Sequence, residues 1–160
     1  MIVVSDTSPL VVLSKIEQLF VLPGLFETVL IPREVAEELE AGNESISGGR
    51  VTIDELPWIR VVDVANPLTT SELGKGEAAA LALARELGAK VLIDEKIGRN
   101  VAARMGLFYT GTVGVLEQAA AKGLLNLEEA FIRLKATDFR ISHEFLDACL
   151  AAFRKSQTDS

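Results

Sequence analysis

The segment IVVSDTSPL at residues 2–10 places a short, mostly apolar run ahead of Asp6 and then a serine followed by proline. An apolar run bounded by polar residues is typical of a buried strand, and Ser8 before proline is a common helix opening. Residues 90–95, KVLIDE, repeat the first half of this pattern, with Asp94 after the apolar run. We therefore expect both aspartates at the carboxyl ends of strands.

Outward from these two segments, strand patterns alternate with helix patterns along the whole chain. Runs rich in Val, Ile, Leu or aromatic residues predict strands at residues 2–5, 27–31, 59–63, 90–93 and 107–110. Apolar residues at three- and four-residue spacing predict helices over residues 11–20, 33–41, 75–88, 97–106, 112–123, 127–135 and 141–153. This alternation predicts an α/β fold, a three-layer α/β/α sandwich around a central, mostly parallel sheet.

Length and composition fit one globular domain. The chain has 160 residues, of which 49% are hydrophobic and 24% charged, and we expect a single domain over residues 1–155 with a frayed tail at 156–160. Residues 42–49, GNESISGG, read as a surface loop. The N-terminus has neither a basic leader nor an uninterrupted apolar span, so we expect a cytoplasmic protein without a membrane segment.

The residue inventory limits the chemistry. A single cysteine and a single histidine exclude a disulfide framework and a Cys/His zinc site. A net charge of −7 repels nucleic acid unless a local basic strip or metal ions offset it. Catalytic ligands would therefore be oxygen atoms, the donors that Mg²⁺ and Mn²⁺ prefer.

Four carboxylates are candidates for such a site. Asp6 and Asp94 end strands, and their side chains would meet if these strands are neighbours in the sheet. Each carboxylate also has an ordinary structural role open to it: a strand-end aspartate often caps a helix, and Glu77 in a first helical turn complements the helix dipole. Glu38 lies among other glutamates, and spacing alone leaves open whether Glu37 or Glu38 turns inward.

The motifs VVSDTSPLVVLSKI, IPREVAEELEAG, GKGEAAALALARELGAKVLIDEKIGRNVAARMG and TGTVGVLEQAAAKG resemble the PIN-domain superfamily, and more narrowly its DUF3368 branch of VapC-like proteins. The resemblance covers residues 2–150 with the motifs in the family's order. It implies a PIN-like sandwich and a Mg²⁺- or Mn²⁺-dependent endoribonuclease, a hydrolase that cleaves single-stranded or structured RNA. It also implies a toxin–antitoxin role with a small antitoxin protein as partner, and a homodimer.

Carried over by motif, the family's catalytic acidic positions fall on Asp6, Glu38, Glu77 and Asp94. Asp6, Glu77 and Asp94 would be metal ligands, direct or through water, and Glu38 would bind a second metal, position water or contact the first ion. The sequence departs from commoner VapC patterns in lacking a further aspartate shortly after Asp94, so the resemblance leaves open whether one metal ion binds or two.

Substrate contacts are predicted from the helix after Asp94. Lys96, Arg99 and Arg104 would form a basic stripe that contacts RNA phosphate, although a solvated helix face explains the same spacing. Weaker candidates for such contacts are Arg33, Lys75 and Arg140, and either Thr110 or Thr112 is expected to cap the helix that follows.

The aromatic residues are predicted to belong to the core rather than to an RNA-stacking surface. Phe20, Phe26, Phe131, Phe145 and Phe153 occupy helical or packing positions in the sequence.

Two other functions compete with the ribonuclease. One is a catalytically weak or inactive PIN-fold module that binds RNA or protein. The other is a phosphotransfer enzyme, because Asp-Thr after a strand also opens haloacid-dehalogenase-like sites. That family has a second aspartate two residues after the first, where this chain has Ser8.

Overall fold

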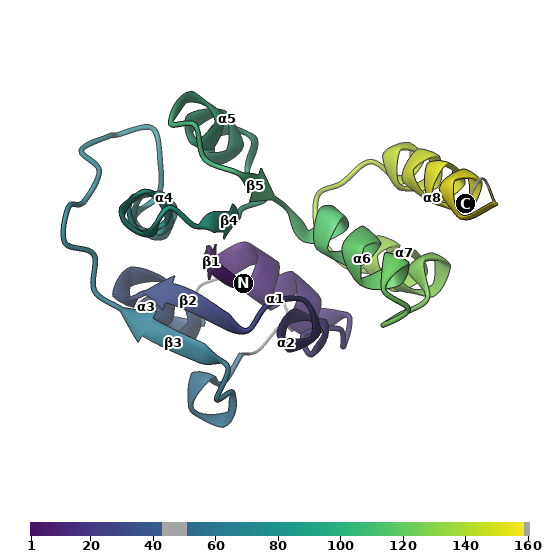
Figure 1. Cartoon of the computed structure of the whole chain (residues 1–160), viewed down its shortest axis with the longest axis horizontal. Helices are drawn as coiled ribbons and strands as arrows, with labels where there is room; N and C mark the ends of the chain where they lie inside the picture. The colour runs from purple at the N-terminus through teal and green to yellow at the C-terminus, as the bar shows by residue number, and fades with distance from the viewer. Residues whose placement is uncertain (43–50, 159–160) are drawn as a thin grey trace.

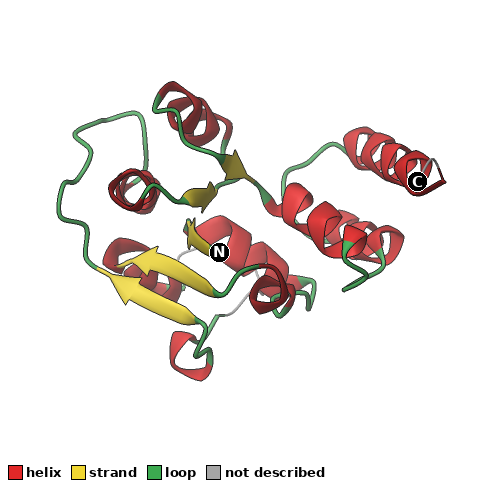
Figure 2. Cartoon of the chain, in the orientation of Figure 1, coloured by secondary structure: helices red, strands yellow, loops and turns green. Residues whose placement is uncertain are grey.

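A computed structural model describes residues 1–42 and 51–158. The predicted loop at residues 42–49 therefore lies, apart from Gly42, outside the described residues. Within the described part, five parallel strands form one sheet, and eight α-helices and one 3₁₀ helix, η1, surround it (Figures 1 and 2). The predicted parallel α/β/α architecture is confirmed.

The strands are β1 (Ile2–Ser5), β2 (Thr28–Pro32), β3 (Ile59–Val62), β4 (Lys90–Leu92) and β5 (Tyr109–Thr110), in the spatial order β3-β2-β1-β4-β5. All four pairings are parallel. The chain therefore builds the sheet outward from β1 in one direction and then crosses to β4 on the other side of β1. This reversal is the topological switch point, where open α/β sheets bind ligands.

Helices cover both faces of the sheet. The helices are α1 (Thr7–Lys15), α2 (Val21–Leu25), α3 (Arg33–Ala41), α4 (Lys75–Leu87), α5 (Lys96–Arg104), α6 (Thr112–Ala121), α7 (Leu127–Lys135) and α8 (His143–Thr158); η1 covers Ile53–Glu55. Val3 packs in one hydrophobic cluster with residues of α1, α2, α3, α6 and α7, whereas Val4 packs in another with α4 and α5. Successive strand residues thus point to opposite faces, each buried beneath helices.

Two local expectations need correction. The predicted helix over residues 11–20 ends at Lys15, because Glu17 adopts a left-handed backbone with φ +60°, and the separate helix α2 follows. Ser8 does not open α1, which begins at Thr7 with Asp6 as N-cap residue. Pro9 is tolerated there because backbone N–H groups in a first helical turn have no intrahelical acceptor.

The C-terminal part extends to one side of the sheet, with the chain end beyond α8 (Figure 1). Helix α8 remains helical through Thr158, so it occupies most of the segment predicted to fray, while residues 159–160 lie outside the description. No helix in residues 1–42 and 51–158 is both long and apolar enough to span a membrane.

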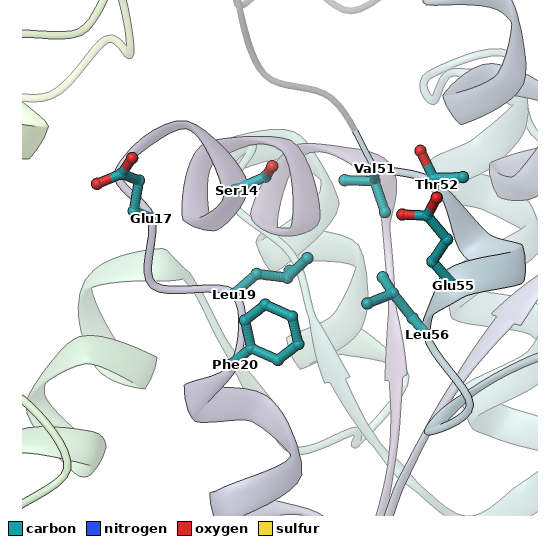
Figure 3. Close-up of a pocket in the computed structure, with 8 residues that line it drawn as sticks. All are labelled: Ser14, Glu17, Leu19, Phe20, Val51, Thr52, Glu55 and Leu56. Atoms are coloured by element: carbon teal, nitrogen blue, oxygen red, sulfur yellow. The ribbon is translucent and has the colours of Figure 1, made fainter.

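A cavity of about 360 Å³ lies between the end of α1 and the segment leading into η1 (Figure 3). Its apolar lining includes Leu19, Phe20 and Leu56. Phe20 was predicted to be a core residue, but it is 71% exposed, and its ring forms a T-shaped pair with that of Trp58, with 6.4 Å between the ring centroids. None of the predicted site residues lines this cavity.

Candidate active site

Asp6 and Asp94 emerge at the same edge of the sheet. Ser5 is paired with Leu92 in the β1–β4 ladder, and the backbone N–H of Asp6 donates to the Leu92 carbonyl at 3.0 Å. Asp94 follows two residues after Leu92. The strands β1 and β4 are therefore neighbours in the sheet, and both carboxylates lie at its switch point.

Glu38 reaches this edge from α3. The Thr7 hydroxyl donates to Glu38 Oε2, and the backbone N–H of Gly76 donates to Glu38 Oε1 at 3.0 Å. Glu37 is exposed, whereas Glu38 is half-buried. The structure thus places Glu38, rather than its neighbour, beside the strand ends.

Glu77 uses its two carboxylate oxygens differently. Oε1 accepts a hydrogen bond from the backbone N–H of Gly74 at 3.2 Å, which caps the start of α4. Oε2 is buried and has no hydrogen-bond partner within the described part of the chain. A Cβ added at Gly98 would come within 3.0 Å of this oxygen, so glycine lets α5 cover it closely. Buried polar atoms are normally paired, so Oε2 marks a site for a ligand.

Asp94 is held by three donors from two helices. Its Oδ1 accepts the backbone N–H of Thr112 at 2.7 Å, and its Oδ2 accepts the hydroxyls of Thr112 at 2.9 Å and Ser8 at 3.2 Å. Gly111 is also needed here, because an added Cβ would lie 2.7 Å from Oδ1. Thr112, expected to cap α6, instead fixes the orientation of Asp94, a role the sequence did not reveal.

These four residues, Asp6, Glu38, Glu77 and Asp94, form what we call the acidic edge. Burial raises the pKa of Asp6 to about 7; the backbone N–H of Thr7 opposes this, and the charges of Glu77, Glu38 and Asp94 add to it. Burial likewise raises the pKa values of Glu77 and Asp94. The neighbouring negative charges therefore disfavour the ionisation of Asp6, and those of Glu95 and Glu38 disfavour the ionisation of Glu77.

The donor set of the acidic edge fits a hard divalent cation. Every candidate ligand is a carboxylate oxygen, and Glu77 Oε2 is buried without a partner. Within residues 1–42 and 51–158, however, no three acidic, histidine or cysteine side chains are already gathered closely enough to hold an ion. A cation at this edge would have to draw the carboxylates further together.

A groove with a volume of about 670 Å³ adjoins Asp94. We call it the basic groove after three of its lining residues, Lys96, Arg99 and Arg140; the carboxylates that also line it are Asp94, Glu95 and Asp138. The positive charge of Arg99 acts on Asp94, where it lowers the pKa against the larger effect of burial. Arg104 does not line this groove and pairs with Glu72 at 3.3 Å. Arg140, one of the weaker candidates from sequence, thus lines the same groove as Asp94, whereas the predicted Arg104 does not.

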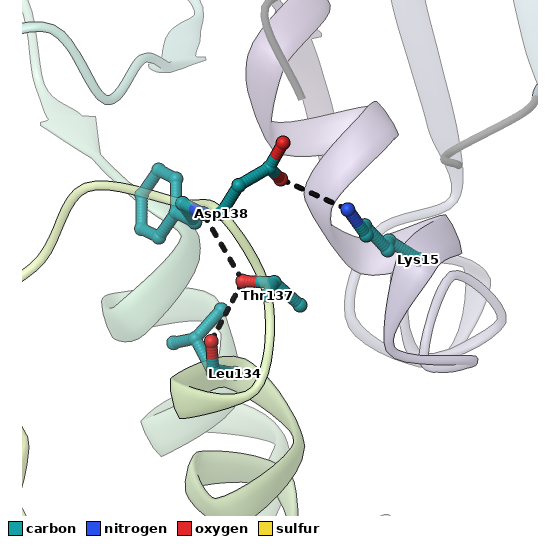
Figure 4. Close-up of polar contacts among 5 residues, drawn as sticks. Lys15, Leu134, Thr137 and Asp138 are labelled. Carbon is teal, nitrogen blue, oxygen red and sulfur yellow. Dashed lines mark hydrogen bonds and ion pairs between the residues drawn. The ribbon is translucent and has the colours of Figure 1, made fainter. Parts of the chain in front are cut away.

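The segment that carries Arg140 into the groove is anchored to the rest of the fold. Lys15 of α1 pairs with Asp138 at 2.9 Å, and the Thr137 hydroxyl donates to the Leu134 carbonyl and accepts the backbone N–H of Phe139 (Figure 4). These contacts fix the connection between α7 and α8 beside α1. No local sequence pattern predicts the ion pair between Lys15 and Asp138, because the two residues lie 123 positions apart in the chain.

The parallel sheet and the acidic edge together are those of a PIN domain, a nuclease-type fold. A model of the DUF3368 family, described as a PIN domain, matches residues 2–155, and the chain belongs to this family. PIN domains are generally nucleases that use divalent metal ions and bind nucleic acid.

Comparison with solved structures supports the fold. The chain resembles a PilT N-terminus domain protein from the hyperthermophilic archaeon Sulfolobus solfataricus P2, with a TM-score of 0.52 and 18% sequence identity. The match covers 74% of this chain and 93% of the archaeal one. No curated protein sequence matches the chain.

Proposed function

We propose that the protein is a Mg²⁺- or Mn²⁺-dependent endoribonuclease that hydrolyses phosphodiester bonds in single-stranded or structured RNA. The observation that carries this proposal is the acidic edge at the switch point: Glu77 Oε2 is buried with no hydrogen-bond partner among the described residues, and the charge of Glu77 acts on the buried Asp6. The family supports it, because PIN domains are generally metal-using nucleases.

In this mechanism Asp6, Glu77 and Asp94 would hold the cation, which when bound supplies charge neutralisation at the scissile phosphate and a more acidic water for in-line attack. The Thr112 and Ser8 donors keep Asp94 oriented toward the groove. Glu38, fixed by Thr7 and Gly76, would orient the attacking water or hold a second ion.

Substrate phosphates would lie along the basic groove. Lys96, Arg99 and Arg140 line it, and none of them forms an ion pair with another described residue. Cations with no internal partner can pair with phosphate oxygens without breaking an existing contact. Arg104 remains a predicted further RNA contact, and it would have to exchange Glu72 for phosphate.

The proposed biological setting is a toxin restrained by a small antitoxin protein, acting as a homodimer. Ala79, Ala80 and Ala84 of α4 are buried within the chain, so these three alanines do not supply a dimer contact. Light scattering on the purified protein gives its mass directly. A monomer at all concentrations contradicts the dimer and leaves the proposed activity untouched.

Cleavage of a panel of RNAs with Mg²⁺, Mn²⁺ or EDTA tests the activity. We expect cleavage by the wild type, loss in EDTA, and a loss of at least about 100-fold in Asp94→Asn and Glu38→Gln. Glu37→Gln is the matched control, because this exposed neighbour should leave the rate unchanged. Unaltered rates in Asp6→Asn and Asp94→Asn would contradict the assignment of the site.

A binding module without catalysis is the second candidate. It is favoured by the internal hydrogen bonds that already occupy both oxygens of Asp94 and of Glu38. RNA binding by the purified wild type with no metal-dependent cleavage of any RNA in the panel would select this function over the nuclease.

A further inference from the structure

A second cavity, of about 540 Å³, continues from the basic groove. Asp94, Arg99, Phe139 and Arg140 line both spaces. From there the cavity extends between β5, α6 and α8, and we call this extension the side pocket. A molecule with a phosphate between the two arginines could therefore place its next group in the side pocket.

The side pocket presents two aromatic rings to solvent. Tyr109 is 41% exposed and Phe145 is 51% exposed, and both line the pocket. Neither ring contacts another aromatic ring in the described part of the chain. The prediction that Phe145 is a core residue is wrong, because α8 buries Leu146 and leaves the preceding side chain in the pocket.

Glu117 of α6 contributes a carboxylate to the same pocket. It is half-buried, and burial raises its pKa. It forms no hydrogen bond or ion pair with other residues among 1–42 and 51–158. A carboxylate that is withdrawn from water and lacks a donor is complementary to a ligand bearing N–H groups.

We propose that the side pocket binds one unstacked base of a single-stranded RNA whose adjoining phosphate lies at Arg99 and Arg140. This inference rests on the proposed function and names its substrate class. Tyr109 and Phe145 supply faces for stacking, and Glu117 accepts hydrogen bonds from the edge of the base. A base inside a duplex keeps its stacking partners and cannot enter such a pocket.

Glu117 also predicts which base is preferred. Guanine offers two adjacent N–H donors on its Watson–Crick edge, matching the two oxygens of a carboxylate, whereas uracil offers one donor between two carbonyl acceptors. The negative Glu117 carboxylate would repel the two carbonyl oxygens of uracil. The pocket should therefore favour guanine over uracil.

The test is equilibrium binding of short, labelled single-stranded RNAs in Mg²⁺, with every protein carrying Asp6→Asn so that RNA stays intact. We expect Phe145→Ala to weaken binding about tenfold, in the range found when a stacking side chain is removed. Phe145→Tyr retains the ring and should restore affinity. Phe108→Ala is the matched control, since Phe108 is 82% exposed and does not line the pocket.

Two further measurements address the base itself. An oligomer of the same length without bases should bind Phe145→Ala and Phe145→Tyr equally, and Glu117→Gln should reduce the preference for guanine-rich over uracil-rich RNA. Equal losses in Phe145→Ala and Phe108→Ala, or no loss in either, would overturn the proposal.

Failure of the side pocket and failure of the nuclease are distinguishable. Metal-dependent cleavage by the unmutated protein, together with unchanged RNA affinity in Phe145→Ala, overturns the side pocket and leaves the proposed function standing. Base-dependent binding that requires Phe145, with no cleavage by the unmutated protein, supports the pocket and overturns the nuclease.

Discussion

The acidic edge and the basic groove meet at Asp94 but are built in opposite ways. At the acidic edge, buried carboxylates are fixed by backbone N–H groups and hydroxyls from distant segments. In the basic groove, exposed cations such as Arg99 and Arg140 form no ion pair with any residue that the structure describes. The first region should therefore be coupled to folding stability, and the second only to ligand affinity.

The largest expected effect is on the pH dependence of stability. The folded pKa of Asp6, about 7, exceeds its ordinary value of 3.8, so the folded state binds more protons than the unfolded chain between these values. Stability without metal should fall as the pH rises through this window, by up to ~4 kcal/mol from this group. Asp6→Asn should remove that loss.

Thermal melting in EDTA at about pH 5 and about pH 8 measures this effect. The melting temperature of Asp6→Asn should exceed that of the wild type clearly at the higher pH and much less at the lower. An equal difference at both values would show that Asp6 ionises normally, and the proposed electrostatic cost of the acidic edge would then be wrong.

Gly76→Ala should disturb both stability and activity. A Cβ there would lie 2.5 Å from Glu38 Oε1, so the carboxylate must move and its hydrogen bond to Gly76 is strained. Although alanine favours helices, we expect a net loss of about 1–3 kcal/mol and slower cleavage. Urea unfolding and single-turnover cleavage measure the two effects, and a stabilised, fully active variant would contradict the role of Glu38.

Arg99→Ala and Arg140→Ala should act mainly on RNA binding, and Arg99→Ala also removes the charge that lowers the pKa of Asp94. Each should weaken binding about three- to tenfold at low salt and reduce the dependence of affinity on salt, because a phosphate contact is lost. Arg104→Ala serves as the comparison, since Arg104 pairs with Glu72 outside the groove and should have the smallest effect. If the α5 stripe predicted from sequence, rather than the groove, carries the substrate, Arg104→Ala should weaken binding more than Arg140→Ala, and Arg99→Ala should weaken it in either case.

Thr7→Val should have the smallest effect. It removes the hydroxyl that donates to Glu38 while keeping the shape of a buried side chain, and we expect a loss of about 1 kcal/mol. Thr7→Ser, which retains the hydroxyl, should recover most of it. Equal unfolding free energies for Thr7→Val and the wild type would show that Glu38 is positioned by Gly76 alone.

The sequence by itself determined the strands and the residues that end them. The short apolar runs before Asp6 and Asp94 are local patterns, and a strand followed by a helix places such residues at the carboxyl edge of a parallel sheet. All five predicted strands are present, and four of the strand–helix alternations lead to helices at the expected residues. These features follow from residue spacing, which needs no long-range contact.

Only the tertiary structure decided how the site is completed. The sequence leaves open whether Glu37 or Glu38 turns inward. The structure places Glu38 there, because it accepts hydrogen bonds from a hydroxyl 31 residues away, on Thr7, and from a backbone N–H 38 residues away, on Gly76. Arg140 came beside Asp94 through a connection tied to α1, and Phe145 was left exposed because α8 packs through Leu146. Periodicity shows which side chains share a face of a helix, whereas burial and partners depend on which distant element packs against that face.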